Sequence, residues 1–153
     1  MKKDEYYMNL ALREARFAAS VGEVPIGAVV VKDGKVISTG HNLREHTEIA
    51  TQHAEIIAIE AACVALHSWR LNDCTLYVTV EPCLMCSGAI LNSRIKRVVY
   101  GTNNKKGGAV NSLYKLLTDP RQNHQTEVLK GVAATQAAKI MQSFFKAKRK
   151  SSK

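Results

Sequence analysis

The sequence lacks any hydrophobic run long enough to cross a membrane as a helix. Its longest apolar stretch, residues 24–31, has only eight residues, whereas a spanning helix needs about 20. The basic start at residues 1–3 leads directly into two acidic residues, so we expect no signal peptide and no membrane partner. With neither signal present, we expect a cytoplasmic location and reduced thiols.

Acidic residues are few relative to basic ones. The chain has 13 Asp and Glu against 22 Lys and Arg, which gives a formal net charge of +9. An excess of this size is typical of proteins that bind polyanions such as nucleic acid, although a basic, well-solvated surface would give the same count. Charge alone leaves both interpretations open.

The chain is too short for two ordinary domains. Its 153 residues, 46% hydrophobic and 23% charged, are typical of one globular domain with a single core. We expect this domain to cover residues 1–149, including a basic C-terminal helix. We expect residues 150–153 to form a disordered tail.

Alternating helix and strand patterns predict an α/β fold. The strongest local signal is Asp33-Gly34, which joins two β-rich runs as a hairpin. Asp4 is a candidate cap for the first helix and Thr51 for the second. The alternation predicts a three-layer α/β/α sandwich around a mixed sheet of roughly five strands. Helices are expected at residues 4–20, 54–66, 83–92 and 133–148, a short helical turn at 112–117, and strands at 26–32, 35–40, 75–80, 97–101 and 126–129.

The helix expected at residues 54–66 is apolar nearly all round. A helix without a polar face is buried on every side. In so small a domain, one side can pack on the sheet and another on a second subunit. The pattern therefore predicts a homodimer.

Only four cysteines occur, and two of them, Cys83 and Cys86, are separated by two residues. At the start of a predicted helix they share a face, and the helix dipole there favours thiolates. His53 supplies an imidazole at the entry of another helix. Two thiolates and an imidazole are a typical zinc ligand set. Cys63 and Cys74 lie in apolar segments and are expected to be buried free thiols.

Glu55 follows His53 by two residues and completes the candidate site. A zinc with three protein ligands keeps one position for water and lowers its pKa, and a nearby carboxylate can act as general acid and base. A structural zinc would instead need a fourth ligand, which His41 or His46 in the preceding loop could supply. Glu81 either holds the turn between strand and helix or faces the pocket.

With these motifs the sequence resembles the bacterial tRNA-specific adenosine deaminases, which have the cytidine deaminase-like fold. The resemblance implies one Zn²⁺ per subunit on His53, Cys83 and Cys86, with Glu55 as the proton shuttle, and a homodimer. The implied reaction converts adenosine-34, the wobble adenosine of a tRNA anticodon stem-loop, to inosine and releases ammonia. The resemblance covers nearly the whole chain and rests on residues 23–29, 40–42, 75–89, 93–95, 98–101, 107–113, 123–124 and 144–145.

The same resemblance implies RNA contacts outside the metal group. Asn42 would hydrogen-bond the target nucleotide. Asn104 stands where some relatives carry Asp, so its contact would lack that charge. Residues 139–153 contain six basic residues and no acidic one, a composition that suits phosphate binding. On this resemblance, and on the charge and ring chemistry of the other residues, the predicted substrate-binding residues are Asn42, Asn104, Lys105, Lys106, Phe145, Lys148 and Arg149.

Aromatic residues make up only 6% of the chain. Phe144 continues the apolar stripe of the last helix, so we predict that it belongs to the core. Phe145 is as consistent with the core as with stacking on an unpaired base. Trp69 is predicted to be a packing anchor.

Two other functions share part of this pattern. A zinc deaminase of a free base or nucleotide would have the same metal motif but no use for a basic tail. A non-catalytic RNA-binding zinc module would have no use for Glu55 beside the metal.

Overall fold

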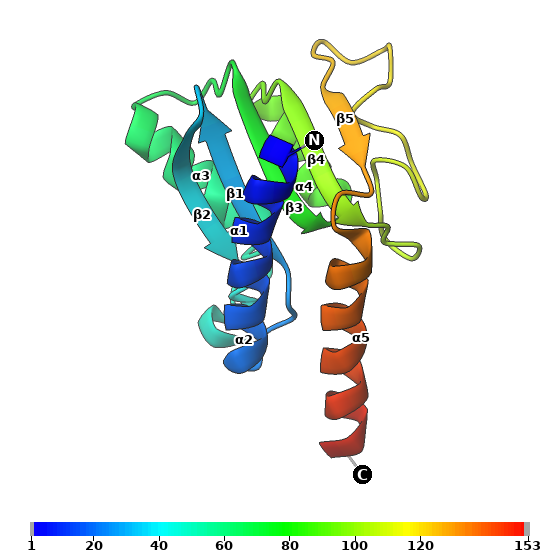
Figure 1. The fold of residues 1–153 in the computed structure, drawn as a ribbon. Coiled ribbons are helices and arrows are strands. Elements are labelled where there is room, and N and C mark those ends of the chain that lie inside the picture. The colour runs from blue at the N-terminus through cyan, green and yellow to red at the C-terminus, as the bar shows by residue number, and fades with distance from the viewer. Residues whose placement is uncertain (1, 152–153) are drawn as a thin grey trace.

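The structure, a computed structural model, describes residues 2–151 (Figure 1). Its five strands and the four long helices follow the predicted order with small shifts of their ends, whereas the short helix α2 was not predicted. The strands are β1 (Gly27–Lys32), β2 (Lys35–His41), β3 (Cys74–Val80), β4 (Arg97–Thr102) and β5 (Glu127–Lys130). The helices are α1 (Lys2–Ser20), α2 (Arg44–Thr47), α3 (Ala54–Leu66), α4 (Leu84–Asn92) and α5 (Ala134–Ser151).

A mixed sheet forms the centre of the molecule. Its five strands lie in the order β2-β1-β3-β4-β5. β1 pairs antiparallel with β2 and β3, whereas β3, β4 and β5 run parallel. Helices α1 and α5 cover one face of this sheet, and α3 and α4 cover the other (Figure 1). The predicted three-layer α/β/α sandwich is confirmed.

The β1–β2 hairpin is confirmed at its turn. Asp33 and Gly34 have φ angles of 50° and 73°, and a two-residue type I′ turn needs positive φ at both positions. β1 is buried on both faces because helices pack on each side of the sheet. Alternate residues of the central strands therefore enter two separate cores, with Val30 beneath α3 and Val29 beneath α1.

Asp4 does not cap α1. It lies inside that helix and is buried, and its carboxylate accepts hydrogen bonds from the Arg97 guanidinium. Thr51 does not cap α3 either, because the residue at that position is His53. The predicted loop at residues 41–52 contains the short helix α2.

Residues 112–117 form turns and irregular chain rather than the predicted helical turn. The backbone N–H of Leu113 donates to the carbonyl of Gly108, and the N–H of Leu116 donates to the carbonyl of Ala109. These spacings of five and seven residues replace the four-residue spacing of an α-helix.

Helix α5 continues to Ser151, so residues 150 and 151 are helical rather than disordered. Its last turns contain Lys, Arg and Ala, which are good helix formers, and no Gly or Pro interrupts them. The rest of the predicted tail, residues 152 and 153, lies outside the described residues. Across residues 2–151, no helix combines the length and apolarity that a bilayer crossing requires.

Helix α3 buries only one side within a single chain. Ala54, Ala58 and Ala62 pack against the sheet, whereas Val64 is 74% exposed and Ile57 is half-buried. The sequence assigned this outer side to a second subunit, and burial there stays a prediction because the structure describes one chain.

Candidate metal centre and active site

The predicted ligands His53, Cys83 and Cys86 meet between the N-terminal ends of α3 and α4. The Sγ atoms of both cysteines lie 3.6 Å from Nδ1 of His53. All three donor atoms lie within 4.8 Å of one another. In a tetrahedral zinc site, with Zn–S of about 2.3 Å and Zn–N of about 2.0–2.1 Å, sulfur and nitrogen ligands lie about 3.6 Å apart. The spacing and chemistry of these donors therefore fit zinc.

The start of α4 favours a thiolate. Cys83 is the residue before the helix, and Cys86 lies in its first turn, where unpaired N–H groups and the helix dipole favour negative charge. A hydrogen bond from Cys86, together with His53, lowers the pKa of Cys83 to about 4. The same bond and burial raise the pKa of Cys86. The Cys83 thiol is therefore ionised at neutral pH, which is the form that binds a metal.

Glu55 lies beside the three donors. His53 precedes α3 in an extended conformation, with φ −81° and ψ 156°, while Glu55 is the second residue of the helix. This break in helical geometry lets residues two apart reach one site. Burial raises the pKa of the Glu55 carboxyl to about 7, and the side chain is only 4% exposed. Near neutral pH such a group can both accept and release a proton.

The two alternative ligands lie at the end of β2 and in α2 rather than in a loop, and each faces a carboxylate. His46 Nδ1 lies 2.5 Å from the Glu23 carboxylate. His41 Nδ1 lies 3.6 Å from the Glu14 carboxylate, and its ring contacts that of Phe17. Within residues 2–151, no fourth His, Cys, Asp or Glu joins the group. The arrangement is that of an open site with three ligands rather than a closed structural one.

Asn42 follows β2 and is buried, with 6% of its surface exposed. Its side-chain Oδ1 has no hydrogen-bond partner. A buried acceptor without a partner is rare in folded proteins, because desolvation of the oxygen is not compensated. Asn42 is therefore available to accept a hydrogen bond from a ligand.

The other predicted RNA contacts fall into two groups. Asn104, Lys105 and Lys106 line a pocket of about 290 Å³ between the loop after β4 and α5. Phe145 and the basic residues beside it lie further along α5 and are not among its lining residues. Phe145 is 37% exposed. The structure thus brings the loop residues together but not the whole predicted set.

Two aromatic predictions need correction. Phe144 is half-buried rather than part of the core, and it lines a groove with Arg16 of α1. Trp69 is 53% exposed, and the Arg70 guanidinium lies 4.2 Å from the centre of its ring. It is therefore not a packing anchor within one chain.

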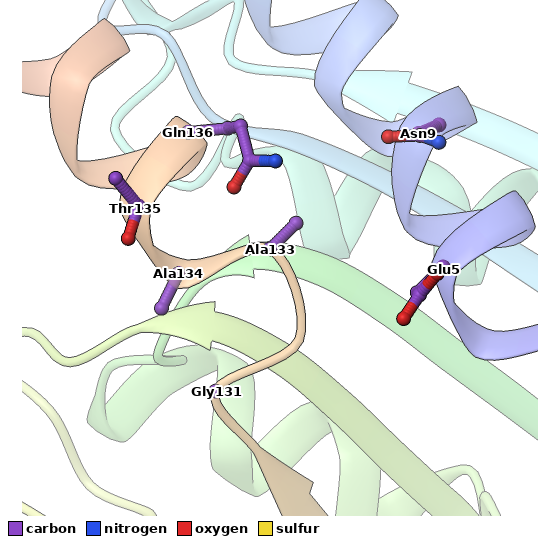
Figure 2. A pocket seen from close by; sticks show the side chains of 7 residues that line it. All are labelled: Glu5, Asn9, Gly131, Ala133, Ala134, Thr135 and Gln136. Carbon is purple, nitrogen blue, oxygen red and sulfur yellow. The ribbon is translucent and has the colours of Figure 1, made fainter. Parts of the chain in front are cut away.

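The pocket in Figure 2 lies between α1 and the first turn of α5 and has a volume of about 410 Å³. It contains no His or Cys, and none of the predicted site residues line it. It is separate from the metal group. Its lining residues are Glu5, Asn9, Gly131, Ala133, Ala134, Thr135 and Gln136.

Glu81 is a residue whose role sequence reasoning left open. Its buried carboxylate accepts hydrogen bonds from backbone N–H groups between Asn104 and Ser112. These partners are 23 to 31 residues away in the chain, so no local pattern could have identified them. Glu81 therefore holds the loop after β4 rather than the strand-to-helix turn.

Comparisons of the sequence and the fold with known proteins show the family of this chain. Residues 1–149 match the family model described as MafB19-like deaminase. The chain is 49% identical over 146 residues to the tRNA-specific adenosine deaminase of Streptococcus pyogenes serotype M1, which covers 95% of this chain and 85% of the relative. It is 47% identical over 153 residues to the tRNA-specific adenosine deaminase of Bacillus subtilis strain 168, with coverage of 100% and 95%.

A solved structure from biochemical and structural studies of A-to-I editing by tRNA:A34 deaminases agrees with these matches. It aligns with a TM-score of 0.85 at 46% identity and covers 88% of this chain and 98% of that one. The matches extend over nearly the whole chain. The chain belongs to the family of tRNA-specific adenosine deaminases.

Proposed function

We propose that this protein deaminates the wobble adenosine of a tRNA anticodon loop to inosine. The observation that carries the proposal is the grouping of His53, Cys83 and Cys86 beside the buried carboxyl of Glu55. That grouping combines an open metal site with a proton carrier, which is what hydrolytic removal of an amine requires. Family membership supports a nucleobase as the substrate.

One Zn²⁺ per subunit would be held by Nδ1 of His53 and the Sγ atoms of Cys83 and Cys86. When bound, zinc supplies a Lewis-acidic open position at which water becomes acidic enough to react near neutral pH. The chain's own residues do the rest. The two thiolates and the imidazole would hold the position at the starts of α3 and α4, with Cys86 buried and His53 and Cys83 half-buried.

Glu55 moves the protons of the reaction. Its carboxylate takes a proton from the attacking water and delivers it to the ring nitrogen beside C6 of adenine. The water oxygen forms a bond to C6, and the bond from C6 to the exocyclic amine breaks. Glu55 then helps to protonate the amine, which leaves as ammonia. A carboxyl pKa near 7 suits both directions of transfer.

Residues outside the metal group would bind the RNA. The unpartnered Oδ1 of Asn42 would accept a hydrogen bond from the target nucleotide. The cationic side chains would bind phosphates, and Phe145 would stack on an unpaired base. The proposed contacts are Asn42, Asn104, Lys105, Lys106, Phe145, Lys148 and Arg149.

A homodimer is part of the proposal. The outer side of α3 exposes Val64 and leaves Ile57 half-buried, which gives an apolar surface that a second copy of the chain can cover. A reducing cytoplasm, the compartment in which tRNA is used, agrees with the four free cysteines.

The rival function is deamination of a free base or nucleotide at the same metal site. The test is to incubate zinc-loaded protein with an anticodon stem-loop that carries a wobble adenosine, and in parallel with free adenosine, free guanine and a cytidine-bearing stem-loop. We expect inosine only from the adenosine stem-loop. Robust turnover of a small molecule would keep the zinc chemistry and overturn the RNA assignment.

A further inference from the structure

Glu81 lies just after β3 and is buried, with only 2% of its surface exposed. Its hydrogen-bond partners lie on the loop that follows β4. Oε1 accepts from the backbone N–H of Asn104 at 3.0 Å and from the Ser112 hydroxyl at 2.5 Å. Oε2 accepts from the N–H groups of Val110, Asn111 and Ser112 at 3.1, 2.7 and 2.8 Å. One carboxylate thus gathers both ends of the loop segment 104–112.

The same loop is fastened to the metal-ligand segment through the backbone. The N–H of Ala109 donates to the carbonyl of Pro82 at 2.9 Å. Cys83 and Gly108 form an isolated antiparallel bridge. The position of the loop is therefore fixed relative to the ligand Cys83, and the Glu81 side chain provides the bonds at its two ends.

Gly108 is the residue that admits the Glu81 carboxylate. A Cβ atom at this position would overlap with the carboxyl carbon and both oxygens of Glu81. The neighbouring Gly107 differs, because the three atoms nearest to a Cβ there belong to the flexible Asn104 side chain, the first being its Nδ2 at 3.3 Å. The two adjacent glycines thus offer a matched pair of substitutions, one that blocks the carboxylate and one that does not.

The loop held in this way carries Asn104, Lys105 and Lys106. Both lysines are exposed, and all three residues line the pocket against α5. We propose that Glu81 is a positioning residue that fixes this loop so that Asn104, Lys105 and Lys106 meet the anticodon loop in register with the metal site. This inference rests on the proposed function. Glu81 acts through the loop and does not touch the substrate.

The first variant is Glu81→Gln, which keeps the shape of the side chain. Each carboxylate oxygen accepts at least two hydrogen bonds, so the amide NH₂ faces donors wherever it points. We expect KM for the stem-loop to rise at least about tenfold, the factor that corresponds to about 1.4 kcal/mol. We expect kcat to change less than KM and zinc to stay at one ion per chain.

A second readout needs no activity. Trypsin cleaves after lysine, and Lys105 and Lys106 lie on the loop that Glu81 holds. Release of the loop in Glu81→Gln should speed cleavage at these two sites, because an unfastened loop enters a protease active site more readily. Cleavage elsewhere should keep its wild-type rate.

Gly108→Ala disturbs the same contact from the loop side. It should reproduce both the rise in KM and the faster trypsin cleavage. Gly107→Ala is the matched control and should keep wild-type trypsin resistance. The double variant Glu81→Gln/Gly108→Ala should be no worse than the more severe single variant, because both changes break one contact.

The proposal is overturned if Glu81→Gln keeps both the wild-type KM and the wild-type trypsin resistance, or if it loses zinc, since Glu81 would then act through the ligands. Should the wild-type protein fail to deaminate the stem-loop, the proposed function fails. The trypsin and zinc measurements would then still decide whether Glu81 holds the loop.

Discussion

The carboxylate of Asp4 and the guanidinium of Arg97 form a two-bond ion pair, with both N–O distances at 2.9 Å. The hydroxyl of Tyr77 donates a third bond to the same carboxylate at 2.7 Å. The pair joins α1 to β4 across 93 residues of sequence. Because the guanidinium favours the ionised form, the pKa of Asp4 falls from its ordinary value of 3.8 to about 2.

This pair predicts a stability that depends on pH. The carboxyl pKa is about 2 in the folded protein and about 3.8 when the chain is unfolded. The stabilisation is therefore complete above about pH 4 and is lost as the pH falls through 2. Asp4→Asn should lower the free energy of unfolding by about 2 kcal/mol at pH 7 and by roughly half as much at pH 3.

Urea unfolding at the two pH values measures this difference. Asp119→Asn is the control, because Asp119 pairs with Arg121, whose side chain is 89% exposed. Solvent screens such a pair, so the control should lose less stability than Asp4→Asn. An equal loss in both variants would show that burial of the Asp4 pair is unimportant.

Glu55→Gln should separate chemistry from binding. The amide keeps the shape of the side chain but cannot carry the proton, so turnover should fall by roughly a hundredfold or more. Zinc content and stem-loop affinity should stay unchanged, as measured by metal analysis and fluorescence anisotropy. Glu127→Gln, at an exposed position on β5, should keep full activity. Wild-type turnover in Glu55→Gln would rule out the proton-shuttle role.

Removal of a ligand should remove the metal. Cys86→Ala leaves only two of the three donors, so the purified protein should contain much less than one zinc per chain. Cys63→Ala is the matched control, because Cys63 is a free thiol outside the donor group. A chelator should abolish turnover of the wild-type protein, and added Zn²⁺ should restore it. Full zinc content in Cys86→Ala would contradict the assignment of ligands.

Charge on the last helix should govern the salt dependence of RNA binding. Lys148→Gln should weaken binding and reduce the slope of log affinity against log salt by about one, because one fewer phosphate is neutralised by the protein. Lys3→Gln removes the same charge from the exposed start of α1 and should leave the slope unchanged. Equal slopes in the two variants would show that the RNA does not contact this part of α5.

The exposed side of α3 should be the dimer interface. Val64→Lys places a charge on a side chain that is 74% exposed in one chain, so it should shift the protein from dimer to monomer in light scattering. Val36→Lys changes an exposed residue on the edge strand β2 and should leave the dimer intact. A dimer that survives in Val64→Lys would place the contact on another surface.

Features that depend on neighbours in sequence could be predicted. The Asp33-Gly34 turn follows from backbone preferences at two positions, and the two cysteines share a helix start because of their spacing. The roles of residues whose partners are distant in the sequence could not be predicted. The local pattern predicted Asp4 as a helix cap, but its partner Arg97 is 93 residues away in the sequence. In the same way, the local pattern of residues 112–117 predicted a helical turn. It could not show that the N–H of Ser112 donates to Glu81 and that those of Leu113 and Leu116 donate to the carbonyls of Gly108 and Ala109.

The central claim is tested most directly by site-resolved measurement of inosine in a full-length tRNA. The tRNA should carry adenosine at the wobble position, be incubated with the zinc-loaded protein, and be read by sequencing, in which inosine pairs as guanosine. We predict conversion at the wobble adenosine and at no other adenosine of the molecule. Conversion spread over other adenosines, or none at the wobble position, would contradict the account.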